Sequence, residues 1–97
     1  MDIDVQSVCG EDIISRDAGL KIRNLILESW DHDKIRILVK GRVIASVSFF
    51  DEAIGLLTKK SGKSWPKIRA KLEFPDLTPE DRALLNSVIR TRLEEHR

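Results

Sequence analysis

Short stretches of alternating apolar and polar residues predict the strands of this chain. Ile3 and Val5 alternate with acidic and amide side chains, which predicts a short strand at or near the edge of a sheet. The same two-residue period recurs over residues 35–39 and, most cleanly, over residues 68–74. Successive side chains of a strand point to opposite faces, so the last segment would bury one face and leave the other in water.

Apolar residues three and four positions apart predict the helices. One helix is expected over about residues 16–30, with Ser15 as a candidate N-cap. Gly19 lies inside it, and glycine costs a helix about 1 kcal/mol relative to alanine. We therefore expect this position to pack closely against another backbone. A second helix is expected over about residues 49–61, and a third begins after Thr78, where proline and two acids follow a capping threonine.

The order of these patterns predicts an α/β fold. Residues 1–97 are expected to form a single domain, with a small mixed sheet covered by about three helices. Residues 40–42 indicate a turn or bulge around Gly41, and residues 43–47 indicate a further short strand or an extended entry to the next helix. We expect residues 96–97 to fray.

Composition and charge narrow the possible functions. The chain is 41% hydrophobic and 34% charged, which is typical of a globular protein, and its formal net charge of +1 gives no global attraction to nucleic acid or membrane. No apolar run approaches the length of a membrane span, and the N-terminus is acidic, unlike a signal peptide. The single cysteine, Cys9, is expected to be a half-buried packing residue, and its lack of an intrachain partner suits a reducing cytoplasm.

The sequence offers little for catalysis. Residues 31–33 hold the only cluster of histidine and carboxylates, and adjacent residues in a turn rarely converge on one metal ion. There is no glycine-rich phosphate loop, zinc spacing or hydrolase nucleophile motif. We therefore expect no enzyme activity, no cofactor and no metal.

Residues 45–55 join an apolar run to a helical pattern. Ser48 is expected at the N-cap, where its hydroxyl would accept a hydrogen bond from the amide of Asp51. The negative charge of Asp51 or Glu52 would interact favourably with the positive, N-terminal end of the helix dipole. Phe50 fits the inward face of this helix, which leaves Phe49 as the expected surface residue. Arg16 opens the preceding helix, and we expect it to pair with Asp51 or Glu52 or to contact a partner.

Residues 59–71 carry six basic side chains and no acid. The strip consists of Lys59, Lys60, Lys63, Lys67, Arg69 and Lys71, with Trp65 in the middle. A helix C-terminus, a loop and the wet face of a strand all accept lysine readily, so these charges need not share a surface. If they do, the strip could dock an acidic protein surface or a nucleic-acid backbone, with Trp65 as a stacking residue.

Four segments together resemble a known family. They are Ser15-Arg16-x-x-Gly19, the strand at residues 35–39, Ser48-Phe49-x-Asp51-Glu52-x-x-Gly55, and Leu72-x-Phe74 before a terminal helix. They are similar to the STAS-like domains, a small bacterial family related to STAS modules and anti-sigma-factor antagonists. The similarity covers nearly the whole chain. In the better-known antagonists a partner kinase phosphorylates a serine or threonine at the matching joint, and this switches binding. Ser48 is similar to that residue by position.

The resemblance implies a non-catalytic, protein-binding regulatory module of the bacterial cytoplasm. The implied partner is an ATPase of the histidine-kinase-like type. The residues expected to contact it are Arg16, Ser46, Ser48, Phe49, Asp51 and Glu52. Ser48 itself has two interpretations, a helix cap without further role or a phosphorylation site. Two other functions stay open: a nucleic-acid-binding accessory using the basic strip, or a structural subunit whose third strand is paired or covered by another chain.

Overall fold

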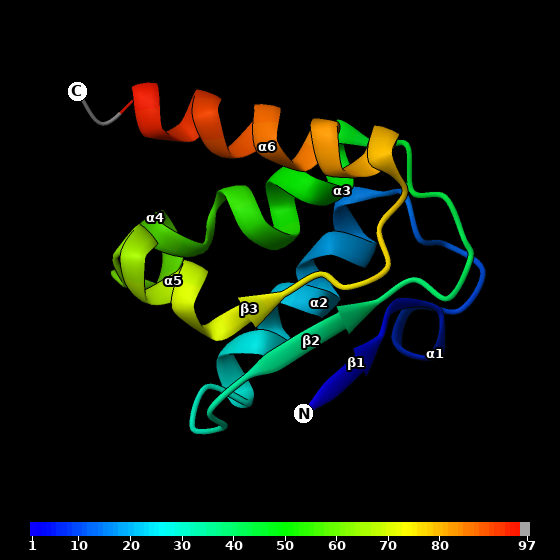
Figure 1. The fold of residues 1–97 in the computed structure, drawn as a ribbon, viewed down its shortest axis with the longest axis horizontal. Coiled ribbons are helices and arrows are strands. Elements are labelled where there is room, and N and C mark those ends of the chain that lie inside the picture. The colour runs from blue at the N-terminus through cyan, green and yellow to red at the C-terminus, as the bar shows by residue number, and fades with distance from the viewer. Residues whose placement is uncertain (96–97) are drawn as a thin grey trace.

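A computed structural model describes residues 1–95 and shows an α/β fold (Figure 1). Three strands form one parallel sheet in the order β1 (Asp2–Asp4), β2 (Ile35–Leu38) and β3 (Leu72–Glu73). The edge position expected for the first strand is confirmed. The expectation of a mixed sheet is wrong, because each connection contains helices that return the chain to the same end of the sheet. The fraying expected at residues 96–97 lies outside the described residues.

Helices make up most of the rest of the fold. They are α1 (Val5–Cys9), α2 (Arg16–Glu28), α3 (Val47–Phe50), the π-helix η1 (Asp51–Gly55), α4 (Leu57–Ser61), α5 (Trp65–Lys71) and α6 (Pro79–Glu94). The capping roles expected for two residues are confirmed: the Ser15 hydroxyl accepts a hydrogen bond from the amide of Ala18, and the Thr78 hydroxyl accepts one from the amide of Asp81. Within residues 1–95, no helix has the length and hydrophobicity that a membrane crossing requires.

The strand predicted over residues 68–74 is mostly a helix. Residues Trp65–Lys71 form α5, and only Leu72–Glu73 pair with the sheet. Trp65, Ile68 and Leu72 are 8%, 2% and 8% exposed, and their spacing of three and four residues matches a helix face. Pro66 in the first turn favours a helix start at this point. The third strand is therefore too short to offer a long edge to another chain.

The segment formed by α3 and η1 lies between α2 and α6, beneath α6 in the view of Figure 1. Two glycines permit this close packing. A Cβ on Gly19 of α2 would lie 2.7 Å from the carbonyl oxygen of Phe49. A Cβ on Gly55 of η1 would lie 2.9 Å from Cγ1 of Val88 in α6. The close approach expected at Gly19 is confirmed, and residues 45–55 lead into the centre of the fold.

The connection from β2 to α3 contains no strand. Lys40 and Gly41 have φ values of +50° and +83°, which confirms the expected turn, and Ala45 has φ of +49°. Two aspartates from the segment after β3 hold this connection. Asp76 accepts hydrogen bonds from the amides of residues 39 and 40, and Asp81 accepts them from the amides of residues 44 and 45, at 2.7–2.9 Å. These bonds fix the backbone just before α3.

The sheet has one buried and one exposed face. Ile3, Ile35 and Ile37 are at most 3% exposed and belong to the apolar core. On the other face, Asp2 and Arg36 are exposed and form an ion pair at 3.6 Å. Most parallel sheets are covered on both faces. Here the outer face is polar, so water can cover it.

Candidate functional site

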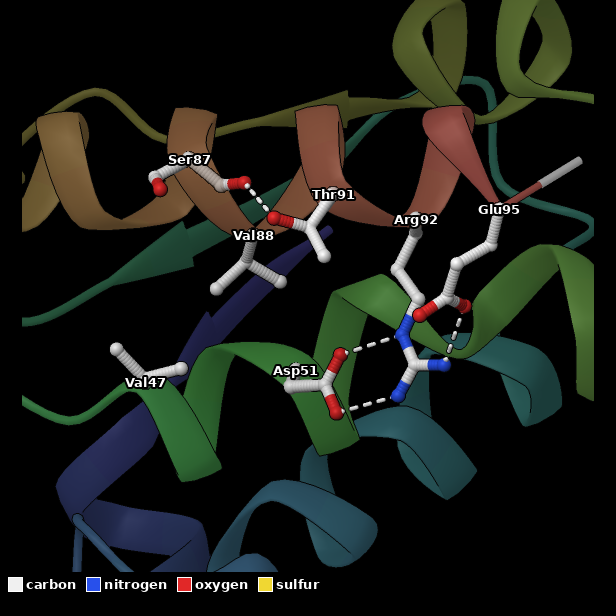
Figure 2. A pocket seen from close by; sticks show the side chains of 7 residues that line it. All are labelled: Val47, Asp51, Ser87, Val88, Thr91, Arg92 and Glu95. Carbon is white, nitrogen blue, oxygen red and sulfur yellow. Dashed lines mark hydrogen bonds and ion pairs between the residues drawn. The ribbon is translucent and has the colours of Figure 1, made fainter. Parts of the chain in front are cut away.

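Asp51 opens η1 and is bound by arginines from two other helices. Arg92 of α6 donates two hydrogen bonds to it, from Nε to Oδ1 at 2.7 Å and from Nη2 to Oδ2 at 2.6 Å (Figure 2). Arg16 of α2 adds a third bond, from Nη1 to Oδ2 at 3.0 Å. Such a bidentate pair is stronger and more directional than a single ion pair. Asp51 therefore connects η1 to both neighbouring helices.

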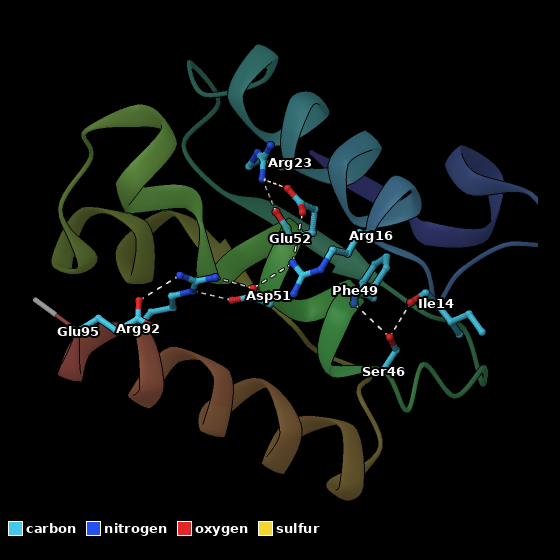
Figure 3. A network of polar contacts seen from close by, with 9 residues as sticks. All are labelled: Ile14, Arg16, Arg23, Ser46, Phe49, Asp51, Glu52, Arg92 and Glu95. Carbon is cyan, nitrogen blue, oxygen red and sulfur yellow. Dashed lines mark hydrogen bonds and ion pairs between the residues drawn. The ribbon is translucent and has the colours of Figure 1, made fainter.

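Glu52 extends the same network toward α2 (Figure 3). Nη1 of Arg23 donates to Oε2 of Glu52 at 2.6 Å and to its carbonyl oxygen at 2.7 Å. Arg16 reaches Oε1 of Glu52 at 3.3 Å. The expected pairing of Arg16 with Asp51 or Glu52 is confirmed, and the structure shows both contacts. We refer to Arg16, Arg23, Asp51, Glu52 and Arg92 as the arginine–acid network. Neither Arg23 nor Arg92 was singled out from the sequence, since no local pattern encodes a contact between distant helices.

The network holds its acids in the charged form. Hydrogen bonds from Arg92, and then from Arg16, lower the pKa of Asp51 below its ordinary value of 3.8 and outweigh the opposing effect of burial. For Glu52, burial is the largest single influence and raises the pKa. The bonds from Arg23 and Arg16 together exceed it, so the pKa is lowered. Both carboxylates are ionised at neutral pH and paired inside the chain, which makes them poor proton donors or acceptors.

The helix that leads into η1 begins two residues earlier than expected, at Val47 instead of Phe49. Ser46 caps α3: its Oγ accepts a hydrogen bond from the amide of Phe49 at 3.1 Å and donates one to the carbonyl of Ile14 at 2.6 Å (Figure 3). Ser48 lies inside α3 and is exposed, so its expected role as the cap is wrong. The sequence offers two capping serines two residues apart, and the carbonyl of Ile14 favours Ser46 because it gives that hydroxyl a second partner.

The surface role expected for Phe49 is also wrong. Phe49 and Phe50 are 3% and 2% exposed, and their rings meet edge to face with centroids 5.6 Å apart. The pattern of apolar residues predicts a single buried face for this helix, with room for only one of the two rings. Because α3 lies between α2 and α6, two of its faces are covered, and both rings belong to the core.

A groove lies between α3 and α6 beside the network (Figure 2). Its volume is about 200 Å³, and it is lined by Val47, Asp51, Ser87, Val88, Thr91, Arg92 and Glu95. Val47 is 55% exposed at its edge. Two further aliphatic side chains are exposed in neighbouring connections. Ile14 precedes α2 and Val43 precedes α3, and each is 56% exposed. The hydrogen bond from Ser46 to the carbonyl of Ile14 joins these two connections.

Only some residues of the basic strip share one surface. Trp65 is only 8% exposed, so its expected role as a surface stacking residue is wrong. Arg69 lines a separate groove against α6, whereas Lys67 and Lys71 line a pocket beside Trp30. Lys63, which follows α4, also reaches Trp30, with its Nζ atom 4.6 Å from the centre of the ring. The remaining lysines, Lys59 and Lys60, lie in the last turn of α4. The helical form of α5 separates these side chains around its axis.

Cys9 is buried, its thiol donates a hydrogen bond to the carbonyl of Ala18 at 3.5 Å, and burial raises its pKa. This is the packing role expected for Cys9, since an active nucleophile needs a lowered thiol pKa. Within residues 1–95, no group of three or more histidine, cysteine, aspartate or glutamate side chains is placed to hold a metal ion.

Comparison with known proteins gave no match to any family model, curated protein or solved structure.

Proposed function

We propose that this protein is a non-catalytic, protein-binding regulatory module that contacts its partner around the start of α3. The observation that carries the proposal is the exposure of Ile14, Val43 and Val47, at 55–56% each, where two connections and α3 meet. We call these three residues and Ser48 the α3-end surface. Single exposed aliphatic side chains are common, but Val47 also lines an open groove, and exposed apolar side chains at a groove are typical of a binding surface.

The arginine–acid network would support this surface rather than form it. Asp51 is 7% exposed and is already bonded to two arginines. A partner would have to break these bonds to use its charge. Arg16 is the member most open to solvent, with a side chain 52% exposed, and can reach both the network and a partner. Affinity would therefore depend mainly on apolar contact at Val47 and its neighbours, with Arg16 at the rim.

Ser48 is the proposed switch within this surface. It is exposed and directly follows Val47, so a kinase could reach it. A phosphate adds a charge of about −2. Asp51 and Glu52, three and four residues further on, are paired with three arginines, which gives the network a net charge of +1, so the phosphate would leave this region at about −1. A negative group beside an apolar contact must be desolvated when the partner binds, which disfavours binding.

The resemblance to STAS-like domains supports the biological setting of the proposal. It favours a cytoplasmic protein of bacteria whose partner is a histidine-kinase-like ATPase. In this setting the module would bind the ATPase while Ser48 is unmodified and release it after phosphorylation.

Variants of Ser48 test the switch. The partner is first recovered by affinity capture from the native host, and the phosphorylation of Ser48 is scored by mass spectrometry in the same sample. Binding of the purified partner is then measured for the wild type, Ser48→Ala and Ser48→Asp. We expect Ser48→Ala to bind like the wild type and Ser48→Asp to bind more weakly. Equal affinities of both variants would exclude the switch, and an unchanged affinity of Val47→Glu would exclude the surface.

A further inference from the structure

Lysine side chains gather around a half-buried tryptophan on a different part of the molecule. Trp30 follows α2 and is half-buried. The Nζ atoms of Lys63 and Lys71 lie 4.6 Å and 5.4 Å from the centre of its ring. An open pocket of about 280 Å³ beside the ring is lined by Trp30, Asp33, Lys67, Ala70 and Lys71. We call Trp30, Lys63, Lys67 and Lys71 the Trp30 site.

Two hydrogen bonds join the two segments that build this site. Lys71 donates from Nζ to the carbonyl of His32, and Lys34 donates from Nζ to the carbonyl of Ala70 at 2.6 Å. The turn after α2 and the end of α5 are thereby held together, although they lie almost 40 positions apart in the sequence. The two backbone segments that carry Trp30 and Lys71 consequently keep a defined relative position before any ligand binds, which lowers the cost of binding.

We propose that the Trp30 site binds single-stranded nucleic acid. A base would displace the ammonium groups of Lys63 and Lys71 from above the indole ring and stack there. The displaced lysines, together with Lys67, would then meet the adjacent phosphates. Proteins that bind single strands without sequence preference combine these two elements, an aromatic stacking platform and a positive groove. Three of the six positive charges of residues 59–71 lie at this site, and Asp33 is the one acidic residue that lines its pocket. The site is separate from the α3-end surface, so neither proposal depends on the other.

The choice of lysine favours nucleic acid over an acidic protein surface. Lysine is depleted at protein–protein interfaces, whereas its ammonium group commonly binds phosphate as a point charge. The Trp30 site contains three lysines and no arginine, and Arg69 of the same helix lines a different groove. A hydrated point charge such as the lysine ammonium suits the attraction of a polyanion. The half-buried indole ring adds a π-face that a carboxylate does not need.

Fluorescence anisotropy with a labelled oligothymidylate tests the proposal on the whole chain. Three phosphate contacts predict a slope of about −2 in log affinity against log salt, or a loss of roughly twentyfold between 50 and 200 mM salt. Trp30→Leu should weaken binding by about fivefold or more because stacking is lost, and Trp30→Phe should restore part of it. Stacking of a base should also quench the fluorescence of Trp30. Trp65 is only 8% exposed, so its fluorescence should not change on binding.

A charge-matched control separates this site from net charge. The triple variant K63Q/K67Q/K71Q should lose most of the affinity and its salt dependence. The variant K21Q/R42Q/R90Q removes the same charge from exposed positions elsewhere and should bind nearly like the wild type. The proposal is wrong if the wild type shows no saturable binding at 50 mM salt, or if both triple variants lose affinity equally. It is also wrong if polyglutamate binds as tightly as the oligonucleotide, which would indicate an acidic protein partner. If Trp30→Leu fails to fold, Trp30→Phe and the triple variants decide the outcome.

Discussion

Truncation of Arg92 gives the sharpest test of how the centre of this fold is held. Arg92→Ala removes two hydrogen bonds to Asp51, of 2.6 Å and 2.7 Å, and leaves that carboxylate with Arg16 alone. Removing one partner of a fully buried ion pair costs about 3–5 kcal/mol. The Arg92 side chain is 21% exposed, and Arg16 still contacts one carboxylate oxygen. We therefore expect a loss of about 2 kcal/mol in the free energy of unfolding.

Urea unfolding at neutral pH measures this loss, with Glu95→Ala as the matched control. Glu95 is the other partner of Arg92, at 3.0 Å, but its side chain is 55% exposed. An exposed pair of this kind contributes about 0.5 kcal/mol or less. Equal losses for the two variants would refute the claim that the buried contact with Asp51, rather than surface charge pairing, holds α6 to η1.

The pH dependence gives a second check on the same pair. The pKa of Asp51 is lower in the folded protein than its ordinary value of 3.8. The stabilisation is therefore complete above this value and is lost as the pH falls through the lower pKa of the folded state. The difference between the wild type and Arg92→Ala should be constant down to about pH 5 and shrink below pH 3.8. A difference that grows on acidification would contradict the assigned direction of the shift.

Three further predictions concern single residues, each measured by urea or thermal unfolding. Ser46→Ala should cost about 1–2 kcal/mol because it removes the cap of α3 and the bond to Ile14, while Ser48→Ala should cost less than about 0.5 kcal/mol; the reverse order would place the cap at Ser48. Gly19→Ala should destabilise by about 1–3 kcal/mol despite the helix propensity of alanine, since its Cβ would lie 2.7 Å from a backbone oxygen; a stabilised variant would contradict this packing. Ala45→Gly should raise stability by about 0.5–1 kcal/mol by relieving a φ of +49°, and a loss would contradict that conformation.

The sequence predicts elements with a strong internal period and clear end signals. The helix α2 has 13 residues, a capping serine and a repeated apolar face, so its pattern has no rival interpretation. The helix α6 begins with a threonine, a proline and two acids, which together mark a helix start. The strand β2 alternates clearly over its four residues. In each case local preference and burial favour the same structure.

Short elements and contacts between distant helices are harder to predict. The helix α5 has seven residues, and Ile68 and Leu72 fit both an alternating strand pattern and a helix face. The helix is distinguished from a strand by the position of Trp65 in the core and by Pro66 in the first turn. The pairing of Arg16 with Asp51 and Glu52 could be expected from the resemblance and the charges, but the contribution of Arg92 could not. Arg92 lies on α6, 41 residues after Asp51. The neighbouring sequence indicates only a pairing of Arg92 with Glu95, three residues further on.

The proposed binding role is tested most directly by affinity capture with a substituted α3-end surface. The wild type, Val47→Glu and the control Leu20→Glu are immobilised, and bound proteins from the native host are quantified by mass spectrometry. Val47 and Leu20 are both exposed aliphatic residues, at 55% and 37%, but Leu20 lies on α2 and outside this surface. We expect a protein that binds the wild type and Leu20→Glu and is lost with Val47→Glu. Its direct binding to the purified wild type would then be measured. Identical protein profiles for all three baits would contradict a protein-binding role of the α3-end surface.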